Sequence, residues 1–593
     1  MGKKITFVRR KTCDITILRR LARGTVARRP ESEQNIHKSM IKNHLLLSAA
    51  VVCTLAAHAA VPARWCDSLA VEAATTVSAT TNEKFNPHWL YSNQWGKYTQ
   101  FNQGEGLIYL RSRLGIVRND FFSLQAGLGV IGNANIDKSF VHEAYLRGKL
   151  WMVDFSAGLD AFTPVAIDDD LTTGSYLMSS NARPTPRAGI GIFDWWKVPF
   201  TFDLLQVRGG CYVGFLFNED DKRFTDDVVT HEKFLYARLS RWNVKPYIGL
   251  IHSVMMGGTR PDGVKIPLDF WASFFGRNGS TEFVETGMRG EHTNAAGAHQ
   301  GLWDLGVNFR VHNAECQIYT HRIFTDGKAK HRIYNGHDYI VGAYVKLPNK
   351  YLNNISLEYF TTEDQGGEGT PDPIGYDKNG QLLVVYPGDV PEKEPGFGEW
   401  IDAHFTPETV AEWEQKHHTT LTYDNSDDFL REIWNNGDGS GRKSYLNNGL
   451  YFQGWSVQGL SRGTSLFHSC RMVDRYVTDG KAMQNLCFFT NVRVVAVNIA
   501  ANGSLTDRLR YRVKYTFTKN HGSLIEKFKG GAFGLSLFEN YFYEKSKIEH
   551  YTLLSLKYEI NRQFEVGADA ACDFGKLYDT FGMRLGLVYR FSK

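Results

Sequence analysis

The 593-residue sequence has little proline (17), few cysteines (8) and almost no long apolar runs. Mean hydropathy is −0.33, and only one apolar run approaches the length of a membrane helix, which excludes a polytopic helical membrane protein. Eight cysteines in a chain of this length do not make a disulfide scaffold. Cys470 and Cys487 are able to pair across one loop, although isolated small apolar residues are the simpler interpretation. The 56 Gly, 38 Phe and 28 Tyr that are present favour β structure.

The net charge of +5 comes from one segment. Residues 1–39 hold 11 Lys/Arg and 3 Asp/Glu, and subtracting them from the totals of 68 and 63 leaves 57 bases and 60 acids. The remainder of the chain is therefore slightly acidic, and the basic excess is no indication of nucleic-acid binding.

A secretory signal peptide is predicted at residues 40–59. Lys42 supplies a positive start, residues 45–57 form a short apolar stretch, and Ala57-His58-Ala59 fits an A-x-A cleavage site. We interpret residues 1–39 as a non-native upstream extension, with translation starting at Met40. The alternative is a long, translated n-region.

Strict alternation of apolar and polar residues dominates the rest of the chain. Residues 508–518 (RLRYRVKYTFT), 564–574 and 581–591 alternate with a period of two, which predicts strands with one apolar and one wet face. Similar stretches lie near 108–116, 121–132, 140–151, 203–216, 233–241, 301–312, 338–347, 353–361, 444–457, 487–499 and 550–560. The pattern predicts about 16–19 strands.

Two architectures fit so many alternating strands, a soluble sandwich and a transmembrane barrel. Runs of ten or more residues, charges and glycines on the wet face, and aromatics at strand ends favour the barrel. We therefore predict an all-β, antiparallel up-and-down barrel over residues 101–593 in the outer membrane of a Gram-negative cell. Residues 60–100 form either a periplasmic segment or a first strand, the latter over residues 71–81.

Two long excursions interrupt the strands. One spans about 362–443, where Thr406 and Pro407 predict a helix start with a Phe405–Val410 staple, and Ser426 is expected to cap a second helix ending near Gly437. The other spans about 255–300. Long loops lie outside in such barrels, so both are expected to be extracellular and to carry function.

Four ordered blocks resemble the Wzi-type capsule assembly family. They are NPHWLYSNQWG at 86–96, GSYL at 174–177 with NARP at 181–184, MGG at 256–258, and YLNNGLY at 445–451 with GWS at 454–456. Two features depart from the family pattern: Ser465 stands where proline is expected, and the 362–443 excursion is longer.

The resemblance implies an outer-membrane barrel of about 18 strands that has no enzymatic activity. It implies lectin-like binding of exported capsular polysaccharide and its attachment to the cell surface. In family members a small periplasmic helical segment partly plugs the barrel, but here only about 40 residues precede the first clear strand, too few for a full helical bundle.

Two groups of side chains are candidate glycan ligands. The inward-facing bases Arg508, Arg510, Arg512, Lys514, Arg584 and Arg590 would attract acidic sugars, or else form structural ion pairs with Glu565, Asp569 and Asp573. Trp400, Trp413 and Trp434 in the first excursion would stack on sugar faces, or else form that excursion's own core.

No catalytic residue, cofactor or metal is expected. The G-x-S-x-G at 459–463 lacks the α/β context of a nucleophile elbow, and an Asp168-Asp169-Asp170 turn is more simply solvated than cation-binding. The expected partners are exported polysaccharide and outer-membrane lipid, with no nucleic acid and a monomeric state. The main alternative function is a diffusion channel for anionic solutes.

Overall fold

The computed structural model describes residues 68–592 except 102–103, 136–137, 169, 289–290, 293–294, 326–337, 366–372, 386–387, 435–443, 478–486, 524–540 and 543–544. The predicted upstream extension and signal peptide lie outside the described residues.

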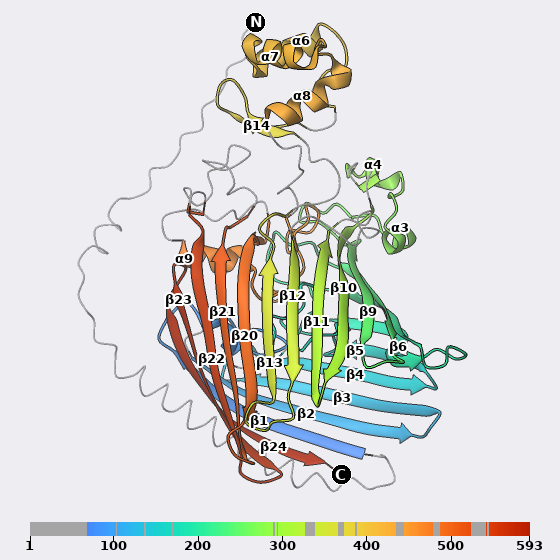
Figure 1. Ribbon diagram of the computed structural model, residues 1–593, viewed down its shortest axis with the longest axis vertical. Helices are drawn as coiled ribbons and strands as arrows, with labels where there is room; N and C mark the ends of the chain where they lie inside the picture. Colours follow the sequence, from blue (N-terminus) through green and yellow to red (C-terminus); the bar gives the residue numbers. More distant parts are fainter. Residues whose placement is uncertain are drawn as a thin grey trace, which may run out of the picture. The chain divides into compact units, whose positions relative to one another are not determined.

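Eighteen antiparallel strands close into one barrel (Figure 1), which confirms the predicted fold and lies within the 16–19 strands that the alternation predicts. Each strand pairs with its neighbours along the barrel wall, and β1 closes the ring against β24. The wall strands are β1 Ser68–Thr80, β2 Gly104–Arg118, β3 Phe122–Asn133, β4 Phe140–Leu150, β5 Val153–Leu159, β6 Pro186–Lys197, β7 Leu205–Phe215, β8 Val229–Leu239, β9 Lys245–Met256, β10 Ala298–Val311, β11 Ala314–Phe324, β12 Tyr339–Lys346, β13 Asn354–Thr361, β20 Val494–Ser504, β21 Leu509–Asn520, β22 Lys547–Glu559, β23 Phe564–Gly575 and β24 Thr580–Ser592.

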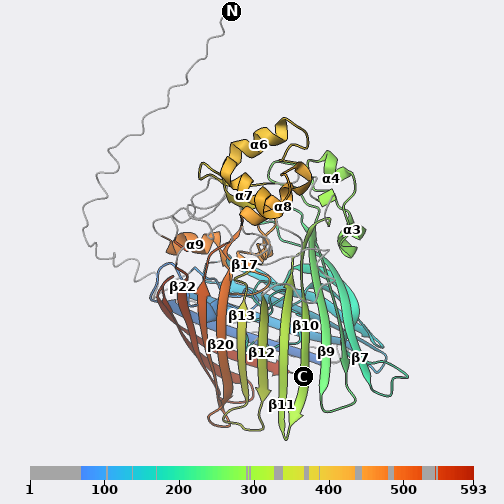
Figure 2. The same ribbon diagram turned by 45° about the horizontal axis from the view of Figure 1, so that its top comes forward.

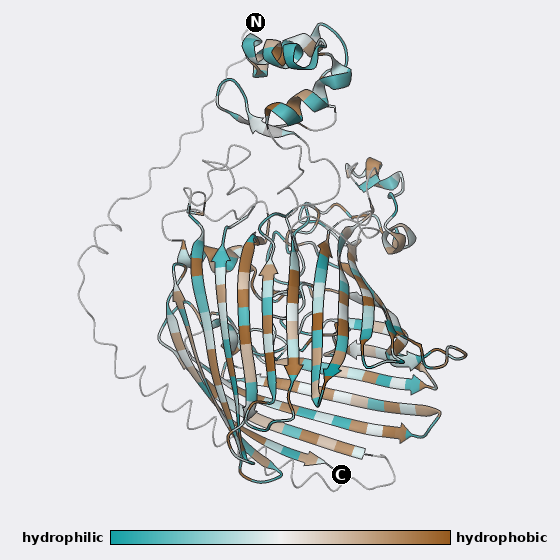
Figure 3. Ribbon diagram, viewed as in Figure 1, coloured by the Kyte–Doolittle hydropathy of each residue, from teal (hydrophilic) through white to brown (hydrophobic). Residues whose placement is uncertain are grey.

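The two faces of the wall differ in the way the sequence predicted. On β24, Met583 and Leu585 are 46% and 55% exposed on the outside, whereas Arg584 between them is buried inside. Apolar and polar bands alternate along the strands in Figure 3. Because closure pairs all the backbone groups that face hydrocarbon, the apolar outer face is able to lie in a bilayer.

Short and long connections lie at opposite rims. At one rim the strands are joined by turns of two to seven residues, and β1 starts and β24 ends there too. At the other rim the chain makes its long connections, including 160–185, 257–297 and 362–493. Short turns mark the periplasmic side of such barrels, so the long connections are extracellular.

The structure corrects several sequence boundaries. Residues 444–457, predicted as a strand, contain only the two-residue β16 (Ser456–Val457) and are largely buried inside the barrel. The stretch at 487–499 splits into β19 (Phe489–Asn491) and β20. Residues 60–100 were expected to form either a periplasmic segment or a first strand. The structure shows strand β1 there, so the barrel begins before residue 101.

The excursion after β13 contains a small fold with its own core. It consists of the hairpin β14 (Ile374–Tyr376) and β15 (Leu382–Val384) and the helices α6 (Gly396–His404), α7 (Pro407–His417) and α8 (Ser426–Ile433). Thr406 caps α7 as predicted, its side chain accepting from the Thr409 amide at 3.3 Å. At the start of helix α8 the N-cap position is Asn425 rather than Ser426, and the Asn425 side chain makes no capping hydrogen bond. In the part of the chain described, no helix is long and apolar enough to cross a membrane.

Candidate functional site

Three segments from the extracellular connections fold into the barrel and pack against the inward side chains of its wall. We call them the inner segments: segment 1 is 81–101, segment 2 is 160–185, and segment 3 is 444–477 with 487–493. Segment 1 carries helix α2 (His88–Tyr91), and segment 3 carries α9 (Cys470–Tyr476). Each contains aromatic side chains that are almost fully buried, namely Phe85, Trp89 and Tyr91 in segment 1, Tyr176 in segment 2, and Tyr445, Tyr451 and Trp455 in segment 3.

The inner segments are joined to one another by backbone contacts. The Thr464 amide donates to the Tyr176 carbonyl at 3.1 Å, and the Ser179 amide donates to the Arg462 carbonyl at 2.9 Å. A Cβ at Gly463 would lie 1.9 Å from the Tyr176 carbonyl oxygen, so only glycine allows this approach. Segments 2 and 3 are therefore packed as one unit.

A buried ion-pair triad ties this unit to the wall. Glu232 on β8 is 2% exposed and accepts from Arg187 on β6 at 2.8 Å and from Arg462 on segment 3. With one acid and two bases, the triad carries a net positive charge. The Arg187 guanidinium lies 4.5 Å from the centre of the Tyr212 ring and makes a cation–π contact with it.

Polar contacts anchor the inner segments to other strands as well. The His88 amide donates to Asp573 on β23 at 2.7 Å, and the Thr173 amide donates to Glu358 on β13 at 2.5 Å. Tyr445 donates its hydroxyl to Asp338, just before β12, at 2.6 Å. Burial raises the pKa of Asp338 to about 7, and the Tyr445 hydrogen bond opposes that rise. The inner segments are thus attached at β13, β23 and the start of β12 in addition to β6 and β8.

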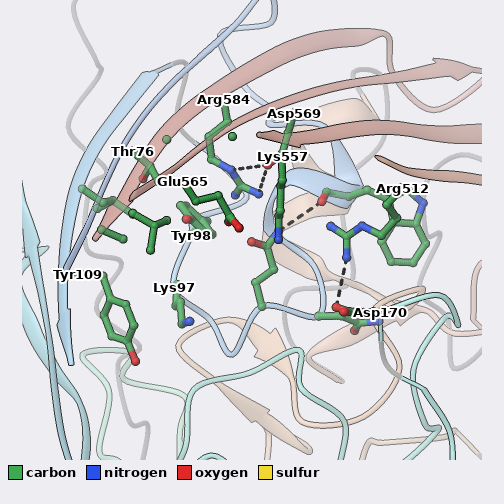
Figure 4. Close-up of a pocket in the computed structure, with 18 of the residues that line it drawn as sticks. Thr76, Lys97, Tyr98, Tyr109, Asp170, Arg512, Lys557, Glu565, Asp569 and Arg584 are labelled. Carbon is green, nitrogen blue, oxygen red and sulfur yellow. Dashed lines mark hydrogen bonds and ion pairs between the residues drawn. The ribbon is translucent and has the colours of Figure 1, made fainter. Parts of the chain in front are cut away.

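A cavity of about 290 Å³ lies inside the barrel against β1, β2 and β21 to β24. Inner segment 1 contributes Trp89, Lys97 and Tyr98 to its lining, and Figure 4 shows Lys97 and Tyr98. The charged residues that line this lumen cavity are the six bases Lys97, Arg512, Lys514, Lys557, Arg584 and Arg590 and the four acids Glu72, Asp170, Glu565 and Asp569. The bases outnumber the acids by two, so the cavity suits an anionic group.

Most of the bases in the lumen cavity are held by a partner. Arg584 pairs with Asp569 at 2.6 Å, and Arg512 pairs with Asp170 at 3.2 Å (Figure 4). Arg590 lies between Glu72 at 3.1 Å and Glu565 at 3.4 Å. These pairs position the guanidinium groups in a fixed arrangement.

The two lysines on the inner-segment side are held differently. Lys514 donates to the Thr172 carbonyl at 2.6 Å, and its amine lies 3.4 Å from the centre of the Trp89 ring. The Lys97 amine lies 4.5 Å from the centre of the Tyr109 ring, and burial lowers its pKa. Both amines therefore contribute positive charge next to aromatic faces.

The six bases that the sequence predicts to face inward do not all lie at one site. Arg512, Lys514, Arg584 and Arg590 line the lumen cavity. Arg510 points to a neighbouring pocket of about 270 Å³ and pairs with Glu565. Arg508 is exposed in the turn before β21, at the periplasmic rim. Structural ion pairing, the alternative left open from the sequence, applies to Arg510, Arg512, Arg584 and Arg590, with Glu565 and Asp569 among the partners as expected.

The three predicted tryptophans belong to the core of the excursion. Trp413 is 4% exposed and donates its indole N–H to Glu432 at 3.2 Å. Trp400 and Trp434 are partly buried against the same cluster, which includes Phe405 and Phe429. The indole ring of Trp434 also occupies the space where a Cβ of Gly375 would lie.

Several residues that line the lumen cavity are not among the site residues predicted from the sequence. Lys557 lies on the inward face of β22. The alternation of apolar and polar residues along this strand was the signal that could have identified it. Lys97 directly follows the 86–96 block, and Asp170 belongs to the aspartate turn that we interpreted as solvated. Gly459 to Gly463 lies in inner segment 3, where the Ser461 hydroxyl accepts from the Gly463 amide at 3.0 Å and has a structural role.

The closed barrel, its apolar outer face and its charged interior define an outer-membrane β-barrel protein. No family model matches the sequence, and no curated protein matches it. Among solved structures, the chain is similar to Wzi of Escherichia coli, described as an outer-membrane protein involved in group 1 capsule assembly and a carbohydrate-binding β-barrel. Identity is 10% and the TM-score 0.46, with 88% of this chain and 84% of that chain covered.

Two Pseudomonas aeruginosa outer-membrane proteins are also similar. OprD matches with 10% identity and a TM-score of 0.40 over 89% of this chain and 95% of that chain. The outer membrane protein opdK matches with 10% identity and a TM-score of 0.39 over 89% of this chain and all of that chain.

Proposed function

We propose that this barrel binds exported polysaccharide at the cell surface and holds it there, without catalysis. The observation that carries the proposal is that three inner segments are packed inside the barrel, where they would obstruct a general diffusion channel. Their buried aromatics and the Arg187–Glu232–Arg462 triad hold them in place.

The inner segments also contain three of the four sequence blocks that resemble the capsule assembly family, whereas the fourth, 256–258, lies where β9 ends. Residues 86–96 lie in segment 1, 174–177 and 181–184 in segment 2, and 445–451 and 454–456 in segment 3. Residues that are far apart in the chain therefore meet in one packed unit, which supports reading them as parts of one functional arrangement.

The mechanism is reversible polar and stacking contact, and no bond is made or broken. The extracellular connections meet the polysaccharide first. The lumen cavity, with six bases against four acids, offers charge-assisted hydrogen bonds to carboxylate or phosphate groups on the glycan.

Deletion of the gene, followed by capsule staining and assay of shed polysaccharide, tests the proposal. Cell-bound polysaccharide should fall and shed polysaccharide should rise, and the wild-type gene should restore both. As a matched control, a gene with Glu315→Gln is introduced into the deletion strain and should also restore both, because Glu315 pairs with Arg310 at the periplasmic rim and is half exposed. Intact cell-bound polysaccharide in the deletion strain would reject the function.

Diffusion of anionic solutes is the second candidate, because the excess of bases in the lumen cavity favours small anions. Planar-bilayer recording of the purified protein separates the two functions. A polysaccharide-binding barrel with an obstructed lumen is expected to give little steady current, whereas a channel gives large, anion-selective currents.

A further inference from the structure

Helix α3 (Phe270–Phe275) in the β9–β10 connection is a short helix with well-defined ends. The Asp269 side chain caps its start by accepting from the Ala272 amide at 3.1 Å. Gly276 ends it in the left-handed conformation with φ of 64°, and the Arg277 amide donates back to the Ala272 carbonyl at 2.8 Å. The sequence FWASFF thus presents four aromatic rings on fewer than two turns.

One side of α3 packs on the outside of the barrel wall. On β8, Glu232 points inward to Arg462, so its neighbours His231 and Lys233 point outward. The His231 ring lies 4.5 Å from that of Phe274. Lys233 donates its amine to the Phe274 carbonyl and lies 3.9 Å from the centre of the same ring. Both views draw α3 beside the rim at which β9 ends (Figures 1 and 2).

This part of the wall lies at a level where the outer surface is apolar. His231 is in register with Val213 on β7, and Val229 is in register with Phe215. Val213 and Phe215 point outward and are 36% and 54% exposed. Without α3, an imidazole and an amine on β8 would therefore face the same apolar surroundings as these side chains, at a high desolvation cost.

The other side of α3 is exposed and aromatic. Trp271 is 66% exposed and Phe275 is 44% exposed, and their rings lie 6.1 Å apart at an angle of only 20°. Leu268, just before the helix, is 56% exposed. The exposed Arg277 guanidinium lies 5.1 Å from the centre of the Phe275 ring. Aromatic and aliphatic side chains with a neighbouring base are typical of a membrane-interface helix.

We propose that α3 is an interfacial anchor: Trp271, Phe275 and Leu268 insert at the boundary of the outer leaflet, and Arg277 contacts lipid phosphate. The occupant is lipid because α3 packs through Phe274 on the outward face of β8, next to the exposed apolar side chains Val213 and Phe215 of β7. The anchor also shields His231 and Lys233 from hydrocarbon, and it fixes the position of the β9–β10 connection relative to the membrane plane.

Photo-crosslinking in whole cells tests the anchor. A benzoylphenylalanine replaces Trp271 in the full chain, and the control position is the exposed Glu285 on helix α4 (Glu282–Glu285) of the same connection. The yield of lipid adduct is expected to be about tenfold higher at position 271 than at position 285. Equal yields at the two positions, no lipid adduct, or an adduct with polysaccharide or protein at position 271 would overturn the proposal.

A second measurement uses a conservative variant that keeps the ring. The fluorescence difference between wild-type protein and Trp271→Phe, measured in proteoliposomes, isolates the emission of Trp271. Lipids brominated on their acyl chains should reduce this difference roughly twofold, since the apolar face of an interfacial helix reaches the acyl boundary. An unchanged difference would contradict the anchor. Neither experiment depends on polysaccharide binding, so the two proposals fail separately.

Discussion

Substitution of Glu232 tests whether the inner segments are held in the lumen by their buried charges. Glu232→Gln keeps the shape of the side chain but leaves Arg187 and Arg462 buried without their acid. Removing one partner of a buried ion pair costs about 3–5 kcal/mol. The substitution leaves the backbone hydrogen bonds between the wall strands in place. The lost free energy is therefore expected to weaken the packing of inner segment 3 against the wall.

The assay is limited proteolysis of the protein in proteoliposomes, with cleavage within residues 444–477 followed by mass spectrometry. A cost of this size raises the population of the released segment by about 100- to 4,000-fold, and cleavage should accelerate accordingly. The control Glu315→Gln breaks a half-exposed pair with Arg310 worth about 0–1 kcal/mol and should change little. Equal cleavage rates for Glu232→Gln and wild type would refute the reasoning.

Three further predictions concern the excursion core, pH and glycine packing. Trp413→Ala should destabilise the α6–α8 core by about 3–5 kcal/mol, seen as faster proteolysis of the excursion, while polysaccharide retention persists. Because burial raises the pKa of Asp338 to about 7 in the folded state, folding favours the protonated acid. Stability should therefore fall as pH rises from about 4 to 7, and Asp338→Asn should flatten that dependence of the unfolding midpoint. Gly463→Ala should separate inner segments 2 and 3 and increase their proteolysis, because its Cβ would meet the Tyr176 carbonyl; Gly449→Ala, with open space around it, is the control.

The wall of the barrel was predictable because one physical rule governs it. Each strand must present apolar side chains to lipid and polar ones to the lumen, so the period of two is visible in β21, β23 and β24. The rule fails at 444–457, where Tyr445 and Tyr451 are buried by the other inner segments and the wall rather than by strand pairing. Alternation alone does not distinguish these two kinds of burial.

The candidate site was predictable only in part, because its partners come from distant parts of the chain. The inward direction of Arg512 and Arg584 follows from periodicity, whereas the pairing of Arg512 with Asp170 requires the fold of inner segment 2. The exposure of Arg508 depends on where β21 begins, one residue later. The aromatics of the excursion were visible in the sequence, but their burial against one another depends on how α6, α7 and α8 pack.

Binding of the host cell's own surface polysaccharide to the purified barrel in nanodiscs tests the central claim most directly. We predict saturable, reversible binding that a neutral, unrelated polysaccharide does not reproduce, with the glycan recovered chemically unchanged. Absence of saturable binding across the concentration range, or recovery of a shortened glycan, would contradict a non-catalytic role in holding polysaccharide at the cell surface.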